Sequence, residues 1–219
     1  MKRKLLVFWA MWAVAAVLFL PLAAQAVQVS FFNITNNNPG DAAIGEAQLF
    51  VDVTDPGSNQ VLFTFKNLGP AASSIADVYF DDGTLLGIAQ IIDTPTYPGV
   101  DFSQNATPAE LPGANDVTPA FVTTAGFSAD STSPPPQNGV NPGEFLGILF
   151  DLIGGQTFAD TIAALTDGSL RIGIHVQAFA SGGSESFVNN PVPIPPTALL
   201  LLSGLAGLGL LGRRRKIKA

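Results

Sequence analysis

Residues 170–180, with the sequence LRIGIHVQAFA, show the most regular alternation of apolar and polar side chains in the chain. One face is apolar and the other is polar or small, with Leu170, Ile172, Ile174 and Val176 set against Arg171, Gly173, His175 and Gln177. A period of two residues predicts a β-strand with one buried face. Gly182-Gly183 then predicts a turn into a second strand over Ser184–Asn189.

Working outward from this hairpin, the same alternation recurs along the chain. Ala47–Thr54 and Val61–Lys66 predict a second hairpin around the turn Asp55–Asn59. Further strands are predicted over Ile75–Phe80 and Leu85–Ile92, paired around Asp81-Asp82-Gly83, and over Phe121–Phe127 and Glu144–Ile153. Many short strands with abundant glycine and proline predict an all-β fold, an antiparallel β-sandwich.

Three segments depart from this pattern. Phe158, Ile162 and Leu165 have helical spacing and predict a short helix over Phe158–Leu165. Asp93–Thr118 is rich in proline and glycine and predicts a long ordered loop or insertion. Ser133–Gly139 predicts an irregular stretch of polyproline character.

The amino-terminal residues 1–26 are typical of a signal peptide. Lys2, Arg3 and Lys4 precede an apolar run over Leu5–Leu22, and Ala24 and Ala26 place small residues at the two positions that a signal peptidase requires. Cleavage after Ala26 makes Val27 the first residue of the mature protein. The alternative is an uncleaved anchor, since the apolar run is longer than usual.

The carboxyl-terminal residues 192–219 combine a proline-rich lead-in, an apolar span and a basic end. The lead-in is Val192, Pro193, Ile194, Pro195 and Pro196, and the basic end is Arg213, Arg214, Arg215, Lys216 and Lys218. Thr197 can cap a helix over Ala198–Gly212. Such a helix rises ~22 Å, against a hydrocarbon core of ~30 Å, so it spans the membrane only if snorkelling arginines and the prolyl lead-in extend it. The basic end then lies on the cytoplasmic side. The alternative is a buried core helix.

This order of parts resembles the PEP-CTERM sorting signal of Gram-negative bacteria, in which a Pro-Glu-Pro motif, a transmembrane segment and an arginine-rich tail are recognised by the membrane protease-transpeptidase exosortase. Pro193-Ile194-Pro195 corresponds to the motif, with Ile194 in place of the family's Glu, and SGLAGLGLLGRRR matches the tail closely. Residues 173–190, GIHVQAFASGGSESFVNN, look like the final hairpin of many PEP-CTERM surface proteins. The resemblance implies export, transient anchoring in the inner membrane, and cleavage near the motif. It leaves the exosortase variant that reads Ile194 open.

The exported part, residues 27–191, is predicted to be one strongly acidic domain. Only Lys66 and Arg171 lie between Val27 and Pro196, whereas all 17 acidic residues lie there, so two basic against seventeen acidic side chains give a net charge of −15. This charge excludes electrostatic binding to nucleic acid. The chain has no cysteine, which excludes disulfides and thiolate catalysis.

No catalytic, cofactor or metal residue is predicted in this domain. His175 is the only histidine, and no Gly-x-Ser-x-Gly elbow accompanies it. Calcium is the one ion with candidate ligands, in the turns that carry Asp52 and Asp55 and that carry Asp77, Asp81 and Asp82. Aspartates in turns are, however, most often hydrogen-bonded to their own backbone.

Three functions from different classes remain open. The leading hypothesis is a non-enzymatic cell-surface or extracellular-matrix protein associated with exopolysaccharide or biofilm, whose partners are signal peptidase, an exosortase and, transiently, the inner membrane. A carbohydrate-binding module is the first alternative, although tryptophan is absent between Val27 and Pro196. A secreted hydrolase with two catalytic carboxylates is the second, because the seventeen acids allow many pairs at the ~5–9.5 Å that glycoside hydrolysis uses.

Overall fold

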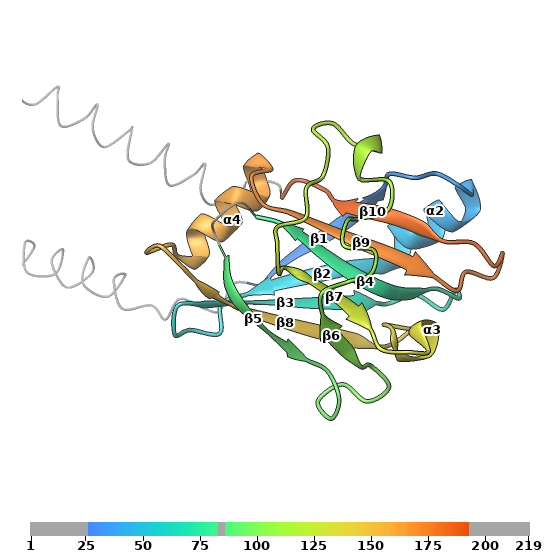
Figure 1. The fold of residues 1–219 in the computed structure, drawn as a ribbon, viewed down its shortest axis with the longest axis horizontal. Coiled ribbons are helices and arrows are strands. Elements are labelled where there is room, and N and C mark those ends of the chain that lie inside the picture. Colours follow the sequence, from blue (N-terminus) through green and yellow to red (C-terminus); the bar gives the residue numbers. More distant parts are fainter. Residues whose placement is uncertain (1–25, 83–85, 193–219) are drawn as a thin grey trace, which may run out of the picture.

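The computed structural model describes residues 26–82 and 86–192 (Figure 1). These residues form a mainly β domain with short helices. The strands are β1 (Val27–Asn33), β2 (Leu49–Thr54), β3 (Gln60–Asn67), β4 (Ser74–Asp81), β5 (Leu86–Ile92), β6 (Phe102–Gln104), β7 (Ser128–Ser131), β8 (Phe145–Leu152), β9 (Arg171–Gln177) and β10 (Glu185–Asn189). The helices are α2 (Pro39–Gln48), the 3₁₀ turn η1 (Ala114–Asp116), α3 (Pro135–Asn138) and α4 (Phe158–Asp167).

All ten strands belong to one antiparallel sheet, in the order β5-β8-β3-β2-β1-β10-β9-β4-β7-β6. Strand β1 joins its two halves, because Val27–Ser30 pair with β2 while Phe31–Asn33 pair with β10. The sheet is therefore curled, as a half-barrel, and its two halves face each other.

The main core lies between these halves and is rich in phenylalanine. Phe80 of β4 packs edge-on against Phe63 of β3 and Phe150 of β8, with ring centroids 5.1 and 4.8 Å apart. The apolar face predicted for residues 170–176 points into this core, where Leu170, Ile172, Ile174 and Val176 are completely buried. Burial of large aromatic rings on both halves holds the curled sheet closed.

A second, smaller core covers the outer face of the β10-β9-β4 part of the sheet. The insertion between β6 and β7 supplies Leu111 and Phe121, which pack with Tyr79 and Val188. Gly173 makes this contact possible, because a Cβ there would lie 2.7 Å from Cδ2 of Leu111. The insertion is thus an ordered cover rather than a free loop.

The helices begin where the sequence offers caps. Thr157 and Asp160 form a capping box at the start of α4, and Asn38 accepts a hydrogen bond from the Gly40 amide at the start of α2. Helix α4 ends at Gly168, whose positive φ of 81° terminates the last turn.

The antiparallel, mainly β organisation predicted from sequence is confirmed. So are the β2–β3 hairpin around Asp55–Asn59, the β9–β10 hairpin, strand β8 and helix α4. Strand β9 ends at Gln177 instead of Ala180, since Ala178 adopts a positive φ of 58°.

Other predictions were wrong. Strands β4 and β5 do not form a hairpin, because β4 pairs with β9 and β7 while β5 pairs with β8. Phe121–Phe127 is not a strand, because Phe121 anchors the outer cover. Ser133–Gly139 contains the helical turn α3 rather than polyproline structure.

Strands β1, β6 and β7 and helix α2 had no counterpart in the prediction. Strand β1 was not anticipated, and α2 takes Ala47 and Gln48 from the strand expected over Ala47–Thr54. The tertiary pairing of β1 with both β2 and β10 stabilises a segment whose alternation is too short to identify on its own.

The described chain begins and ends at the same end of the sheet (Figure 1). After β10, the Asn190 amide donates to the Ser30 carbonyl, and the Val192 amide donates to the Leu165 carbonyl of α4. Across residues 26–82 and 86–192, no helix combines the length and apolar character needed to cross a bilayer.

Candidate functional site

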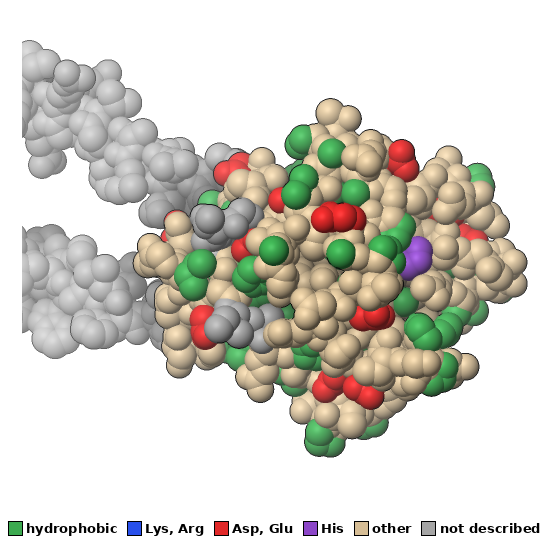
Figure 2. Space-filling view, in the orientation of Figure 1, with side chains coloured by type: hydrophobic (Ala, Val, Ile, Leu, Met, Phe, Trp, Pro, Cys, Tyr) green, Lys and Arg blue, Asp and Glu red, His purple; other side chains and the backbone are tan. Residues whose placement is uncertain are grey.

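A row of polar side chains crosses the outer face of the sheet over four neighbouring strands. Asp130 of β7 lies opposite Asp77 of β4, Asp77 lies opposite His175 of β9, and His175 lies opposite Ser186 of β10. Directly opposed residues of antiparallel strands have Cβ atoms ~4.5–5.5 Å apart. Figure 2 shows the histidine at the surface of this face, among mostly uncharged residues.

Asp77 and Asp130, hereafter the acid pair, lie directly opposite each other on β4 and β7. Asp77 is only 3% exposed and its Oδ1 has no hydrogen-bond partner. Burial, the neighbouring charge of Asp130 and the hydrogen bond between the two carboxyl groups together raise the pKa of Asp77 from 3.8 to about 8. At neutral pH Asp77 therefore keeps its proton. Two carboxyl groups in contact lie closer than the ~5–9.5 Å of glycoside hydrolysis.

His175 contacts Ser186 but does not form a nucleophilic site with it. The Nδ1 atom lies 3.1 Å from Oγ of Ser186, and Ser186 is completely buried. A nucleophile must reach its substrate, which a buried hydroxyl cannot do. Burial lowers the pKa of His175 against the opposing charge of Glu185, so the ring is neutral at pH 7.

Glu185, next to Ser186, is a completely buried carboxylate with many donors. Its oxygens accept from Nδ2 of Asn33 at 3.0 Å, Oγ1 of Thr35 at 2.5 Å, and the amides of Asn37 and Asn38 at 3.1 and 2.5 Å. Burial acts to raise the pKa of Glu185, but the hydrogen bonds outweigh it and the pKa is lowered. Glu185 thereby fixes the loop between β1 and α2.

The two basic side chains of the described domain are already paired. Lys66 forms an ion pair with Asp52, and Arg171 forms one with Asp81. Arg171 also donates to the carbonyls of Pro119 and Ala120, both at 2.6 Å, and lies over the Phe121 ring, so it fastens the insertion to β9. Neither cation compensates the acid pair.

The candidate calcium ligands are not brought together. Asp52 and Asp81 are taken by Lys66 and Arg171, and Asp55 accepts from the Gly57 amide of its own turn. Asp82 is buried and accepts from the Leu86 amide. Within residues 26–82 and 86–192, no group of three or more histidine and acidic side chains is placed to hold a metal ion.

Neither tyrosine is among the fully exposed side chains of the described part. Tyr79 is completely buried and its hydroxyl donates to the Pro108 carbonyl, while Tyr97 is half-buried beside Phe145. The large apolar side chains exposed in the described part are Leu68, Val122 and Ile153, none of which is aromatic.

The predicted sorting residues lie mostly beyond the described part of the chain. Ala26 is exposed and directly precedes β1, and Val192 is buried against α4. Ala24, Pro193, Ile194, Pro195, Pro196 and the basic tail Arg213, Arg214, Arg215, Lys216 and Lys218 lie outside the described residues.

Fold and site together define an acidic, curled antiparallel β domain in which a buried Asp77 faces a half-buried Asp130. Comparison of the chain with protein-family models, with curated proteins and with solved structures returns no match. Sequence reasoning placed His175 on the polar face of its strand but did not identify Asp130, Glu185 or Ser186. Of these three residues, only Glu185 could have been noticed in the sequence, as an acidic residue close to the apolar Phe187 and Val188 in a predicted strand.

Proposed function

We propose that this protein is an exported, non-enzymatic cell-surface or extracellular-matrix protein, processed by signal peptidase and by an exosortase-type transpeptidase. In this proposal the two halves of the curled sheet form the two layers of a β-sandwich, and the acidic domain is the part delivered outside the cell. After processing it is associated with exopolysaccharide or biofilm.

One observation carries the proposal: the folded domain fills the interval between the two predicted processing sites. Strand β1 begins at Val27, directly after Ala26, and Val192 directly precedes Pro193-Ile194-Pro195 in the sequence. Val192 is 4% exposed and hydrogen-bonded to α4, so it belongs to the packed fold. In this proposal, cleavage at both sites releases that fold.

The shared position of the two domain ends supports the same proposal. Because β1 starts and β10 ends at one end of the sheet, both processing sites lie on that end. This arrangement suits a domain tethered to a membrane through both ends before processing. The Val192 amide donates to the Leu165 carbonyl, so Val192 lies beside α4.

The test is the intact mass of the protein released from Gram-negative cells that express an exosortase. We expect a mass that corresponds to cleavage after Ala26 and near Pro193, together with any attached glycan. Deletion of residues 193–196 is expected to keep the chain in the inner membrane. Pro142→Ala, which changes an exposed proline inside the domain, is the matched control and should be processed normally. Normal release of the deletion variant contradicts the proposal.

A further inference from the structure

Strands β6 and β7 form a short ribbon at one edge of the curled sheet. Strand β7 is held to β4 through three register pairs, Asp77↔Asp130, Val78↔Ala129 and Tyr79↔Ser128, flanked by bonds from the Phe80 amide to the Phe127 carbonyl and from the Thr124 amide to the Phe80 carbonyl. On its other side β7 pairs with the three residues of β6. Phe102 and Ala129 also join the main core, so the backbone attachment of the ribbon to the sheet is the β4–β7 ladder.

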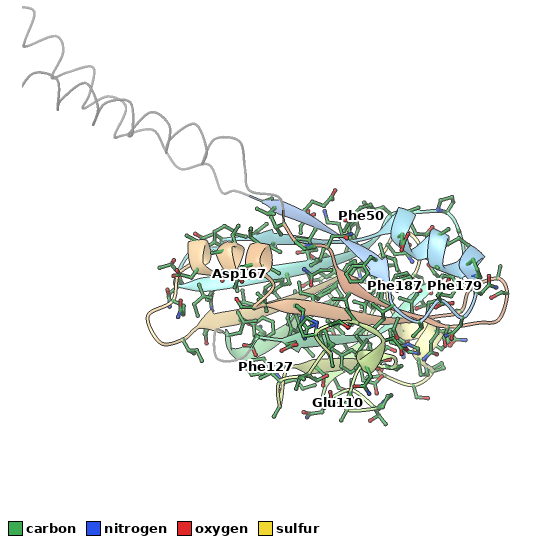
Figure 3. The ribbon with its side chains drawn as sticks, turned by 90° about the horizontal axis from the view of Figure 1, so that it is seen from above. Phe50, Glu110, Phe127, Asp167, Phe179 and Phe187 are labelled. Atoms are coloured by element: carbon green, nitrogen blue, oxygen red, sulfur yellow. The ribbon has the colours of Figure 1, made fainter. Side chains whose placement is uncertain are left out.

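The inner side of β7 covers an apolar pocket between the two halves of the sheet. Ala129, Phe127 and Phe150 line it together with Phe80, Ile91 and Ile148. The rings of Phe127 and Phe150 are stacked, with centroids 5.5 Å apart, so the segment that leads into β7 lines the pocket. Figure 3 labels Phe127, on the side of the domain opposite Phe50. Displacement of β7 would expose these apolar side chains to solvent.

The outer side of β7 carries the acid pair, at the point where β7 meets β4. Asp77 is buried with one unpartnered oxygen, and Lys66 and Arg171 are engaged with other carboxylates. When both members of the acid pair are ionised, no basic side chain of the described residues compensates them. Two negative charges then face each other directly across the β4–β7 ladder, in surroundings that screen them poorly.

We propose that the β6–β7 ribbon stays closed over the apolar pocket while Asp77 keeps its proton opposite Asp130, and that loss of this proton favours release of the ribbon. Because the pKa of Asp77 is raised from 3.8 to about 8, the closed ribbon loses stability as pH rises through this range. This inference is independent of the proposed export and processing.

The other titratable groups around the acid pair do not change charge in the same range. Burial lowers the pKa of His175 on β9, which is already neutral, and burial raises the pKa of Tyr79 on β4, which stays protonated. Glu110 faces Tyr79 from the insertion. Hydrogen bonds keep the pKa of Glu185 on β10 low, so it stays ionised.

Amide hydrogen exchange of the full chain, measured by mass spectrometry between pH 5 and pH 9 and corrected for intrinsic rates, tests the proposal. Protection of residues 102–104 and 128–131 should fall by up to about tenfold for each pH unit as pH rises toward 8 and should level off above it, while β3 keeps its protection. Asp77→Asn and Asp130→Asn should each remove this dependence. Asp116→Asn, which removes an exposed charge on the insertion, should leave it unchanged. Protection that does not depend on pH in the wild type, or that still depends on it in both variants, overturns the proposal.

A thiol reporter gives a second measurement that does not need the Asp77 variant to fold. The chain has no cysteine, so Ala129→Cys places a single thiol on the buried side of β7, and Ser103→Cys places one on exposed β6. The ratio of the labelling rate in Ala129→Cys to the labelling rate in Ser103→Cys should rise by up to about tenfold from pH 6 to pH 7 and should level off above pH 8. A constant ratio contradicts ribbon release.

Discussion

Glu185 and Asp77 are two acids buried to the same degree in one half of the sheet, yet they are held in opposite ways. Glu185 is 0% exposed and accepts hydrogen bonds from four residues of the segment 33–38, whereas Asp77 is 3% exposed and has one oxygen without a partner. The pKa of Glu185 is lowered and that of Asp77 is raised. Burial alone therefore does not decide the charge of a carboxyl group; the number of donors aimed at it does.

The two carboxyl groups also differ in whether their contribution to stability depends on pH. Glu185 needs its charge to organise the β1–α2 loop, so its contribution is permanent at neutral pH. Asp77 is compatible with the fold only as a member of a protonated pair, so its contribution depends on pH. Each prediction below changes one side of this comparison, from the largest expected effect to the smallest.

Glu185→Gln is expected to have the largest effect. The amide offers one acceptor in place of a carboxylate and turns a donor toward the backbone amides of Asn37 and Asn38, so the free energy of unfolding should fall by about 2–4 kcal/mol at pH 7. Urea unfolding followed by circular dichroism measures it. Glu46→Gln is the control: this exposed residue accepts one bond from the Asn33 amide, and its loss should stay below about 1 kcal/mol. An equal loss in the free energy of unfolding for the two variants would contradict the larger contribution expected of Glu185.

Asp77→Asn is expected to stabilise the protein, but only at higher pH. The folded pKa is raised from 3.8 to about 8, so the folded state binds more protons than the unfolded state in between, and wild-type stability falls as pH rises through this range. Asparagine cannot ionise, so the variant should gain about 1–3 kcal/mol at pH 9 and lose this advantage near pH 4. Unfolding curves at the two pH values check this. A gain of the same size at pH 4 would contradict the assignment.

Thr35→Val should weaken the Glu185 side of the comparison by about 1–2 kcal/mol. It removes a donor at 2.5 Å to Oε2 of Glu185 and an acceptor for the Ser186 amide at 3.0 Å. The effect of acid pH also has a defined sign. A carboxyl group with a lowered pKa gives stability that is lost as pH falls, so the variant should unfold at a higher pH than the wild type. Acid unfolding curves of wild type and variant provide the measurement, and coincident midpoints would argue against the hydrogen bond.

His175→Gln should have the smallest effect on the free energy of unfolding, below about 1 kcal/mol at pH 7. The strand of His175 lies between those of Asp77 and Glu185, but its ring is half-exposed. Its lowered pKa means that the folded state binds fewer protons than the unfolded state below pH 6.5, so wild-type stability is lost as pH falls there. The variant should lose less between pH 6.5 and pH 5. Thermal unfolding at these pH values checks it, and an identical loss in both proteins would rule out the histidine.

The fold could be predicted where neighbouring residues carry the signal. Alternation identified β2, β3, β8 and β9. Prediction failed where distant segments decide: the bulge in β4 between Ile75 and Asp77 turns Asp77 to the outer face, and β4 continues to β9 rather than to β5. The candidate site was predictable only in His175, since Asp77 and Asp130 are separated by the whole insertion.

The sequence by itself determined the strand periods, the two tight hairpins, the acidic charge of the domain and the predicted targeting ends, because each depends on residues close together along the chain. The tertiary structure alone decided that β1 joins two halves of one sheet, that the insertion covers its outer face, and that Asp77 is buried opposite Asp130 with a raised pKa. The physical reason is that strand pairing and burial are set by packing of the whole domain, and the charge of a buried carboxyl group follows from the partners that packing brings to it.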